Sequence, residues 1–239
     1  MALNKEVFKT RTITAIVFAA VMLAGLFIPG GILFFALFLV ILCGCLFEFY
    51  KIARIIKPKN FLTYLPLGLF YIIIPVLLLI RMGFSNIIVA DGKHFLSSSF
   101  IYSPLIPCAI IFSIWINDTM AYIVGSLIGK TPFSKISPKK TWEGTMGGAL
   151  LCGMVIALLG YFIPAATVLP VKHWIIIAAL CALFGTLGDL FESKLKRMAG
   201  IKDSGSFMPG HGGFLDRFDS LLWAAPAVWL YLRFMMPLF

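Results

Sequence analysis

The sequence predicts an all-α fold: a polytopic transmembrane helical bundle of about seven spans, with a polar site at the cytoplasmic membrane interface. Of its 239 residues, 61% are hydrophobic and only 13% are charged, about half the charged fraction of a soluble domain. The mean hydropathy is +1.00. The apolar residues gather in long segments, and the basic residues lie in short runs between them. This pattern is typical of a multi-pass membrane protein.

Seven segments are long and apolar enough to cross a bilayer, which takes about 20 mostly apolar residues. They are Thr12–Pro29, Gly31–Tyr50, Phe61–Ile80, Phe100–Leu127, Gly144–Ile163, His173–Glu192 and Ser220–Leu238. The short turn at residues 29–31 makes the first two spans an antiparallel hairpin. Pro66 and Pro75 lie inside the third span and predict a kink there.

The lysines and arginines predict the orientation of these spans, because cytoplasmic loops carry an excess of them. With a cytoplasmic N-terminus, sixteen of the 20 basic residues fall on the cytoplasmic side. The four exceptions are Arg81, Lys93, Lys172 and Arg233. The C-terminus is then outside, and Met82–Ser99 is the main outer loop. The net charge of +10 thus indicates membrane orientation and contacts with anionic lipid or phosphate, and no nucleic-acid partner.

We expect two regions in this single membrane domain. Residues 1–99 form N-terminal transmembrane scaffold helices, whose role as scaffold, lipid-facing wall or dimer face stays open. Residues 100–239 form a C-terminal catalytic transmembrane region, because the polar clusters of the chain lie there.

The first polar cluster is Asn117-Asp118, with Tyr122 one helical turn later. It lies within an otherwise apolar span, where an ionisable side chain is costly and indicates function. The alternative is a hydrogen bond that packs two helices together.

The second cluster joins two spans and includes the segment from Ser137 to Gly144. Lys139 and Lys140 are well placed to bind a polyphosphate, although basic residues also anchor cytoplasmic loops. Glu143 is either a first-turn partner of the helix dipole or a metal or base residue.

The third cluster lies on one face of the sixth span, since its members recur at helical spacing. They are Asp189, Glu192, Ser193, Lys196 and Arg197. The acids lie deeper in the membrane than the bases, so the face grades from a metal site to a phosphate site. The alternative is an ion-paired stripe inside the bundle.

The stretch from Ser193 to Asp219 continues this cluster with the parts of a phosphoryl- or nucleotidyl-transfer site. Its glycines allow backbone N–H groups to approach an anion, its bases neutralise phosphate, and its carboxylates suit Mg²⁺. These glycines, bases and carboxylates are Lys194, Lys196, Arg197, Lys202, Asp203, Gly205, Gly210, Gly212, Gly213, Asp216, Arg217 and Asp219. The alternative is a solvated cytoplasmic loop.

This stretch resembles the signature of the phosphatidate cytidylyltransferases, also called CDP-diglyceride synthases. The pattern is Ser-x-apolar-Lys-Arg, four residues, Lys-Asp, and then Pro-x-His-Gly-Gly-apolar-x-Asp-Arg-apolar-Asp; every fixed position is filled. Met208 stands where the family more often has Ile, Leu or Phe. The segments Asn117–Tyr122 and Ser137–Gly144 also resemble the family, so the resemblance covers roughly the C-terminal half.

The resemblance implies that CTP and phosphatidate react to give CDP-diacylglycerol and pyrophosphate. It also implies a homodimer. The distribution of basic residues then predicts a protein of the cell (inner) membrane whose active site faces the cytoplasm. We expect Mg²⁺ as cofactor and Mn²⁺ as its substitute, and a monovalent cation stays open. The nucleophile is an anionic phosphate oxygen, so the reaction needs neither a strong base nor a covalent intermediate.

We assign three sets of site residues. The catalytic set is Asp216, Asp219, Asp203, Lys202, Asp189 and Glu143. The substrate-binding set is Lys139, Lys140, Ser193, Lys196, Arg197, His211, Gly212, Gly213, Arg217 and Asp118. The metal set is Asp216 and Asp219, followed by Asp189, with Asp203 and Glu192 ranked below them. Asp216 and Asp219 point the same way if their helix begins near Phe214; helix capping and an ion pair are their alternative roles.

Two other functions stay open. A CTP-dependent lipid kinase would use a similar site, but it would release CDP instead of pyrophosphate. A polytopic transporter would show repeated halves or broken helices at mid-membrane, whereas the acids here cluster at one face. The string Asp-x-x-Asp-Gly-x-x-Ala-Arg of the CDP-alcohol phosphatidyltransferases is absent.

Overall fold

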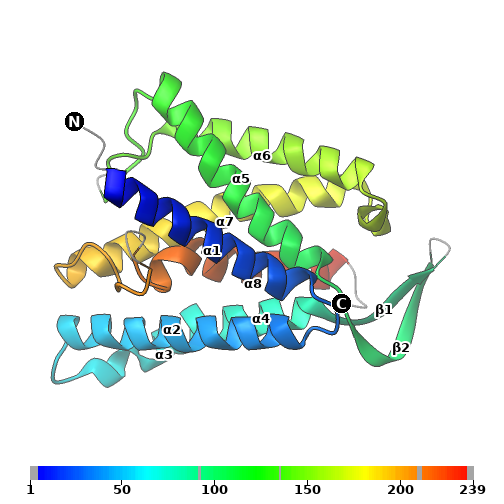
Figure 1. Cartoon of the computed structure of the whole chain (residues 1–239), viewed down its shortest axis with the longest axis horizontal. Coiled ribbons are helices and arrows are strands. Elements are labelled where there is room, and N and C mark those ends of the chain that lie inside the picture. The colour runs from blue at the N-terminus through cyan, green and yellow to red at the C-terminus, as the bar shows by residue number, and fades with distance from the viewer. Residues whose placement is uncertain (1–4, 91–92, 135, 209–211, 236–239) are drawn as a thin grey trace.

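The computed structural model describes residues 5–90, 93–134, 136–208 and 212–235. The chain forms a bundle of long helices with a short hairpin at one end (Figure 1). The long helices are α1 (Lys5–Phe27), α2 (Ile32–Ile56), α5 (Leu105–Ile128), α6 (Trp142–Phe162), α7 (Val171–Met198) and α8 (Leu215–Met235). A further rod, Phe61–Gly83, is built from consecutive shorter helices.

Each of the seven predicted spans coincides with one of these helices or with this rod, which confirms the all-α bundle. Within the described residues, five of them are long and apolar enough to cross a membrane: α2, Phe61–Gly83, α5, α6 and α7. The chain is therefore a multi-pass membrane protein. The apolar part of α1, Thr12–Phe27, is shorter, so the crossing of the membrane by α1 and α8 stays a prediction.

The rod Phe61–Gly83 changes helix type near its two prolines. A 3₁₀ turn, η1 (Phe61–Tyr64), precedes α3 (Leu65–Gly68), a π-helical turn, η2 (Leu69–Ile73), follows, and α4 (Ile74–Gly83) completes the rod. Pro66 and Pro75 each lack the N–H that a regular helix would use, so the ladder of backbone bonds is adjusted beside them.

The segment Met82–Ser99, expected as the main outer loop, is mostly a β-hairpin, and its side of the membrane stays a prediction. Strand β1 (Phe84–Ala90) pairs antiparallel with β2 (Lys93–Tyr102), with an irregularity between Ser85 and Ile87. The hairpin projects from the end of the helical body (Figure 1). Its second strand takes residues 100–102, so α5 begins at Leu105 rather than at the predicted Phe100.

Helix α6 shows how the bundle faces lipid on one side and protein on the other. Leu150, Met154 and Leu158 form a stripe at helical spacing and are between 56% and 63% exposed. The opposite face is buried and rich in glycine, and a Cβ at Gly148 would strike the backbone of Ala121 in α5. Small residues thus let these helices pack closely, while the apolar stripe suits a membrane.

Two helices that carry predicted acids, α7 and α8, also approach each other closely. Gly188 of α7 lies against Asp219 of α8, and a Cβ at Gly188 would collide with the backbone carbonyl of Asp219. Glycine is therefore required where these two helices cross, and this crossing brings their acids together.

Candidate active site

Three carboxylates meet where α7 and α8 cross. Asp189, Glu192 and Asp219 each offer an oxygen atom, and these three atoms lie within 4.8 Å of one another. Glu192 and Asp219 are only 0% and 8% exposed. Buried like charges this close repel strongly unless a cation or a proton compensates them.

The three-acid group fits a divalent cation such as Mg²⁺. Apart from its ion pair with Lys196, Glu192 receives no hydrogen bond on either carboxylate oxygen within the described part of the chain. One oxygen of Asp219 accepts the N–H of Ser220 at 2.6 Å. Hard oxygen ligands of this kind suit Mg²⁺, which usually binds one or two carboxylates together with water and phosphate.

Two lysines border the three-acid group. Lys140, which precedes α6, forms an ion pair with Asp189. Lys196 of α7 lies between two acids, with its Nζ 2.5 Å from Glu192 and 2.6 Å from Asp216. The side chain of Lys196 is only 12% exposed, so it is a desolvated cation, which is well suited to bind an anion.

Asp216 lies outside the three-acid group, which changes the predicted metal set. Its Oδ2 accepts the N–H groups of Ser204 and Gly213, each at 2.8 Å, and lies 2.9 Å from the Ser204 hydroxyl. Its Oδ1 is taken by Lys196 at 2.6 Å. Asp216 therefore holds the backbone at Ser204 and Gly213. Glu192 lies beside Asp189 and Asp219, in the place that was predicted for Asp216.

These contacts also favour the ionised form of Asp216, which precedes the expected span Ser220–Leu238. Burial works against ionisation, but the hydrogen bonds from Gly213, Lys196 and Ser204 outweigh it and lower the pKa of Asp216 to about 2. The carboxylate that ties α8 to Lys196 is thus charged at neutral pH.

Sequence reasoning missed Glu48, a carboxylate of α2 that reaches the start of α8. Its Oε1 accepts the N–H of Phe214 at 3.0 Å, and its Oε2 accepts the N–H of Leu215 at 2.9 Å and the hydroxyl of Ser204 at 2.7 Å. Glu48 is only 5% exposed. It satisfies N–H groups at the start of α8 that lack partners within the helix. A signal was present: Glu48 is an ionisable residue inside a predicted span, as Asp118 is.

Asp118 of α5 belongs to the surroundings of the three-acid group. It accepts a hydrogen bond from the side-chain amide of Asn117 at 3.4 Å. The charged groups that act on it most strongly are Lys140, Asp189 and Arg217. The first polar cluster of the sequence therefore lies near the third.

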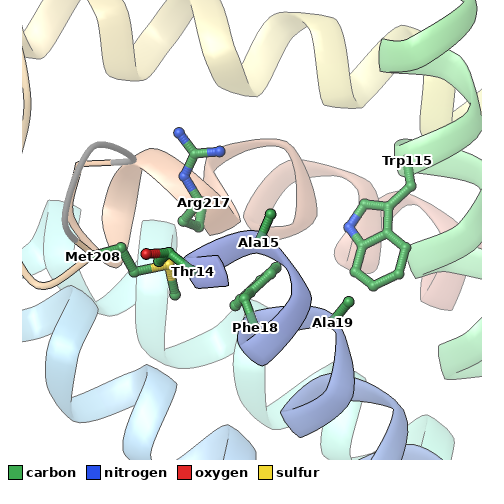
Figure 2. A pocket seen from close by; sticks show the side chains of 7 residues that line it. All are labelled: Thr14, Ala15, Phe18, Ala19, Trp115, Met208 and Arg217. Carbon is green, nitrogen blue, oxygen red and sulfur yellow. The ribbon is translucent and has the colours of Figure 1, made fainter. Parts of the chain in front are cut away.

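Arg217 is exposed and lies at the edge of a pocket of about 260 Å³ between α1, α5 and the start of α8 (Figure 2). The pocket is lined by Thr14, Ala15, Phe18, Ala19, Trp115, Met208 and Arg217. Its walls are mostly apolar, and Arg217 brings the only formal charge among these residues. This combination suits part of a molecule with an apolar body and an anionic group.

Glu143 folds the segment between α5 and α6 and is not part of the three-acid group. Its carboxylate accepts the backbone N–H of Lys130 at 3.2 Å, and both the N–H and the hydroxyl of Thr131, at 3.1 and 2.8 Å. In the same segment the N–H of Phe133 donates to the carbonyl of Lys140 at 2.8 Å. Glu143 therefore helps to place Lys140.

The other predicted residues differ in how near they lie to the three-acid group. Ser193 donates to Asp189 at 3.4 Å. The side chains of Lys139, Arg197, Lys202 and Asp203 are exposed, and no contact with the three-acid group is found for them in the described ranges. Arg197 donates instead to the carbonyl of Ile201 at 3.2 Å.

The glycines of the signature are also only partly described. Gly212 has a left-handed φ of +85°, and a Cβ there would strike the carboxylate of Asp216, so glycine is required. The predicted substrate-binding residue His211 lies outside the described residues.

Several known proteins are similar to this chain. A protein named phosphatidate cytidylyltransferase from Synechocystis sp. is 44% identical over 131 residues, which is 52% of this chain and 42% of that protein. Proteins of the same name from Staphylococcus haemolyticus and Staphylococcus aureus are each 39% identical, over 57% of this chain and 48% of theirs. The aligned part of the chain thus spans about half the length of these relatives.

The Cytidylyltransferase family matches residues 102–235, which is more than half of the chain. This range contains the three-acid group, both bordering lysines and Asp216, whereas Glu48 lies before it. The chain therefore belongs to the Cytidylyltransferase family.

Proposed function

We propose that this protein is a phosphatidate cytidylyltransferase, which converts CTP and phosphatidate to CDP-diacylglycerol and pyrophosphate. The observation that carries this proposal is the three-acid group, bordered by Lys140 and Lys196, in a bundle of apolar helices. Such a site serves a reaction between two phosphate anions, one of them attached to a lipid. The relatives named above bear the name of this activity.

In this reaction a phosphate oxygen of phosphatidate attacks the α-phosphorus of CTP. The bond from that phosphorus to the oxygen bridging to the β-phosphate breaks, and pyrophosphate leaves with the electron pair. The nucleophile is already ionised, so the protein needs to hold the two anions together and to counter their repulsion. Lys140 and Lys196 supply positive charge for this purpose, and each can exchange an acidic partner for a phosphate oxygen.

Asp189, Glu192 and Asp219 would hold Mg²⁺, which when bound neutralises phosphate charge in reactions of this type. Compared with the sequence-based assignment, Glu192 replaces Asp216 because both oxygens of Asp216 have protein partners. We keep Mn²⁺ as a substitute for Mg²⁺. A monovalent cation and a homodimer stay predictions.

The pocket beside Arg217 supports a lipid acceptor. Its apolar walls suit the part of a lipid near the headgroup, and the guanidinium of Arg217 suits a phosphate. Its volume of about 260 Å³ is below the usual range of about 300–1,000 Å³ for ligand pockets, so most of the acyl chains would remain in the bilayer. We further propose that the site faces the cytoplasm from the inner membrane, in line with the distribution of basic residues.

The choice of acceptor tests this proposal against a lipid kinase. Purified protein with CTP and Mg²⁺ should release pyrophosphate when phosphatidate is supplied and should release none with diacylglycerol. Release of CDP with diacylglycerol as acceptor would support the kinase and contradict the proposal.

A further inference from the structure

We propose that Glu48 is a positioning residue of the active site, through which the N-terminal helices hold the start of α8 in its working geometry. The proposal rests on the proposed function for its kinetic consequences, but its structural part can be tested without any activity. Glu48 lies outside residues 102–235, the range matched by the family. It is an acid of an apolar helix, α2, that touches the signature stretch from a distant part of the chain.

The three partners of Glu48 are all donors. Phe214 and Leu215 offer backbone N–H groups, and Ser204 offers its hydroxyl. The positive end of the α8 dipole lies at the same place and favours a negative charge. A buried carboxylate is costly unless hydrogen bonds satisfy it, and here both of its oxygens accept. Glu48 therefore fixes the backbone at the start of α8.

Two glycines of the signature stretch are shaped around Glu48. A Cβ at Gly205 or at Gly213 would collide with the Glu48 carboxylate. Neither glycine has a left-handed φ, so backbone conformation does not explain why glycine stands there. The space taken by Glu48 does explain it. The carboxylate thus fits both backbone segments that enclose it, residues 204–205 and 213–215.

A chain of contacts leads from Glu48 to the three-acid group. The Ser204 hydroxyl lies 2.7 Å from Glu48 and 2.9 Å from Asp216, and Asp216 pairs with Lys196, which pairs with Glu192. Asp219 lies one helical turn after Leu215 on α8. A change in the first turn of α8 would therefore move Asp219 and release Lys196 from Asp216. The predicted result is weaker divalent-cation binding at the three-acid group.

The substitution Glu48→Gln tests this inference with little change in shape. An amide has one accepting oxygen, so its NH₂ group must face at least one of the three donors. We expect faster amide hydrogen exchange in peptides covering residues 212–219. We also expect a fall in kcat of about 10- to 100-fold, the loss typical of a hydrogen bond to a charged group. The Mg²⁺ concentration for half-maximal rate should rise, while the KM for phosphatidate stays the same.

Cys43→Ser on the same helix is the matched control, because Cys43 is exposed whereas Glu48 is buried. It should leave exchange and kinetics unchanged. Unchanged exchange at residues 212–219 in Glu48→Gln would overturn the proposal. So would exchange that rises equally in all helices, because Glu48 would then support the whole fold and not this turn. If wild-type protein shows no cytidylyl transfer, the proposed function fails, while the exchange result still judges Glu48.

A double-mutant cycle tests the contact between Glu48 and Gly213 directly. Gly213→Ala should destabilise the protein, because the added methyl group meets the Glu48 carboxylate. In a Glu48→Ala background that space is open, so the same change should cost much less. The expected coupling is read from thermal unfolding in detergent. Equal effects of Gly213→Ala in both backgrounds would contradict the contact and overturn the proposal.

Discussion

Lys140, which precedes α6, forms an ion pair with Asp189 of α7, so a predicted phosphate ligand contacts a predicted metal ligand. The two side chains are 30% and 27% exposed, which places the pair at the edge of the site and not in its interior. A lysine and an aspartate so placed can exchange partners when phosphate and a cation arrive together. This relationship connects two of the three polar clusters of the sequence.

Replacing Lys140 should weaken the use of CTP. We expect Lys140→Ala to lower kcat/KM for CTP. The corresponding loss of transition-state stabilisation should be about 1.5–3 kcal/mol, the usual value of one hydrogen bond to a charged group. Lys172→Ala, which removes an exposed charge at the other end of α7, is the control and should have normal kinetics. Normal kinetics in a correctly inserted Lys140→Ala protein would remove Lys140 from the site.

Asp219→Asn and Asp216→Asn should have different effects, because Asp219 is proposed to bind the metal whereas Asp216 holds the backbone at Ser204 and Gly213. Asp219→Asn keeps the shape but removes charge from the three-acid group, so we expect near-total loss of turnover and an altered response to Mn²⁺. Asp216→Asn places an amide NH₂ against the donors of Ser204 and Gly213 or against Lys196. It should lower the free energy of unfolding by about 1.5–3 kcal/mol.

Turnover across a Mg²⁺ titration and thermal unfolding in detergent measure these two effects. If Asp219→Asn keeps wild-type turnover at limiting Mg²⁺, the three-acid group is not the metal site. If Asp216→Asn is as stable as wild type, the role of Asp216 in holding this backbone is wrong.

Glu143→Gln should loosen the segment between α5 and α6. The amide cannot accept from all the donors of Lys130 and Thr131 that the carboxylate holds, so residues 130–134 should exchange amide hydrogen faster. Lys140 is then less well placed, and the KM for CTP should rise. Unchanged exchange combined with lost turnover would show that Glu143 acts on the substrate or the metal, as the sequence left open.

The proposed orientation predicts which loops can be labelled from each side of the membrane. In a variant without native cysteines, a single cysteine at Ser98 in β2 should react with an impermeant reagent from outside. A cysteine at Ser137, between α5 and α6, should react only from the cytoplasm. Labelling of both from the same side would overturn the span count.

Much of the fold could be predicted because apolar segments of membrane length are a strong signal, and each predicted span coincides with a helix or helical rod. The hairpin was missed because Met82–Ser99 was interpreted only as a loop between spans and residues 100–102 as the start of the next span. Asp91-Gly92 is a strong hairpin signal when it stands between two strand-like runs. The sequence thus contained a turn signal, but a search for apolar segments alone does not detect it.

The sequence named most of the polar side chains that the structure brings together, but not how they pair. Asp189 and Asp219 were expected together, and Gly188 explains how close they come. The sequence could not show that Glu192, and not Asp216, joins Asp189 and Asp219. That arrangement depends on the hydrogen-bond partners that Asp216 finds in the folded chain. Glu48 was missed because its partners follow it by more than 150 residues in the sequence, a separation that only the packing of α2 against α8 closes.

The transfer of the cytidylyl group of CTP to phosphatidate is tested most directly by following an isotope label in CTP. Purified protein is supplied with phosphatidate, Mg²⁺ and CTP labelled at either the α- or the γ-phosphate, and the lipid product is separated. We expect the α-label to enter the lipid while the γ-label is released in pyrophosphate. Appearance of the γ-label in the lipid, with the α-label left in CDP, would contradict this transfer.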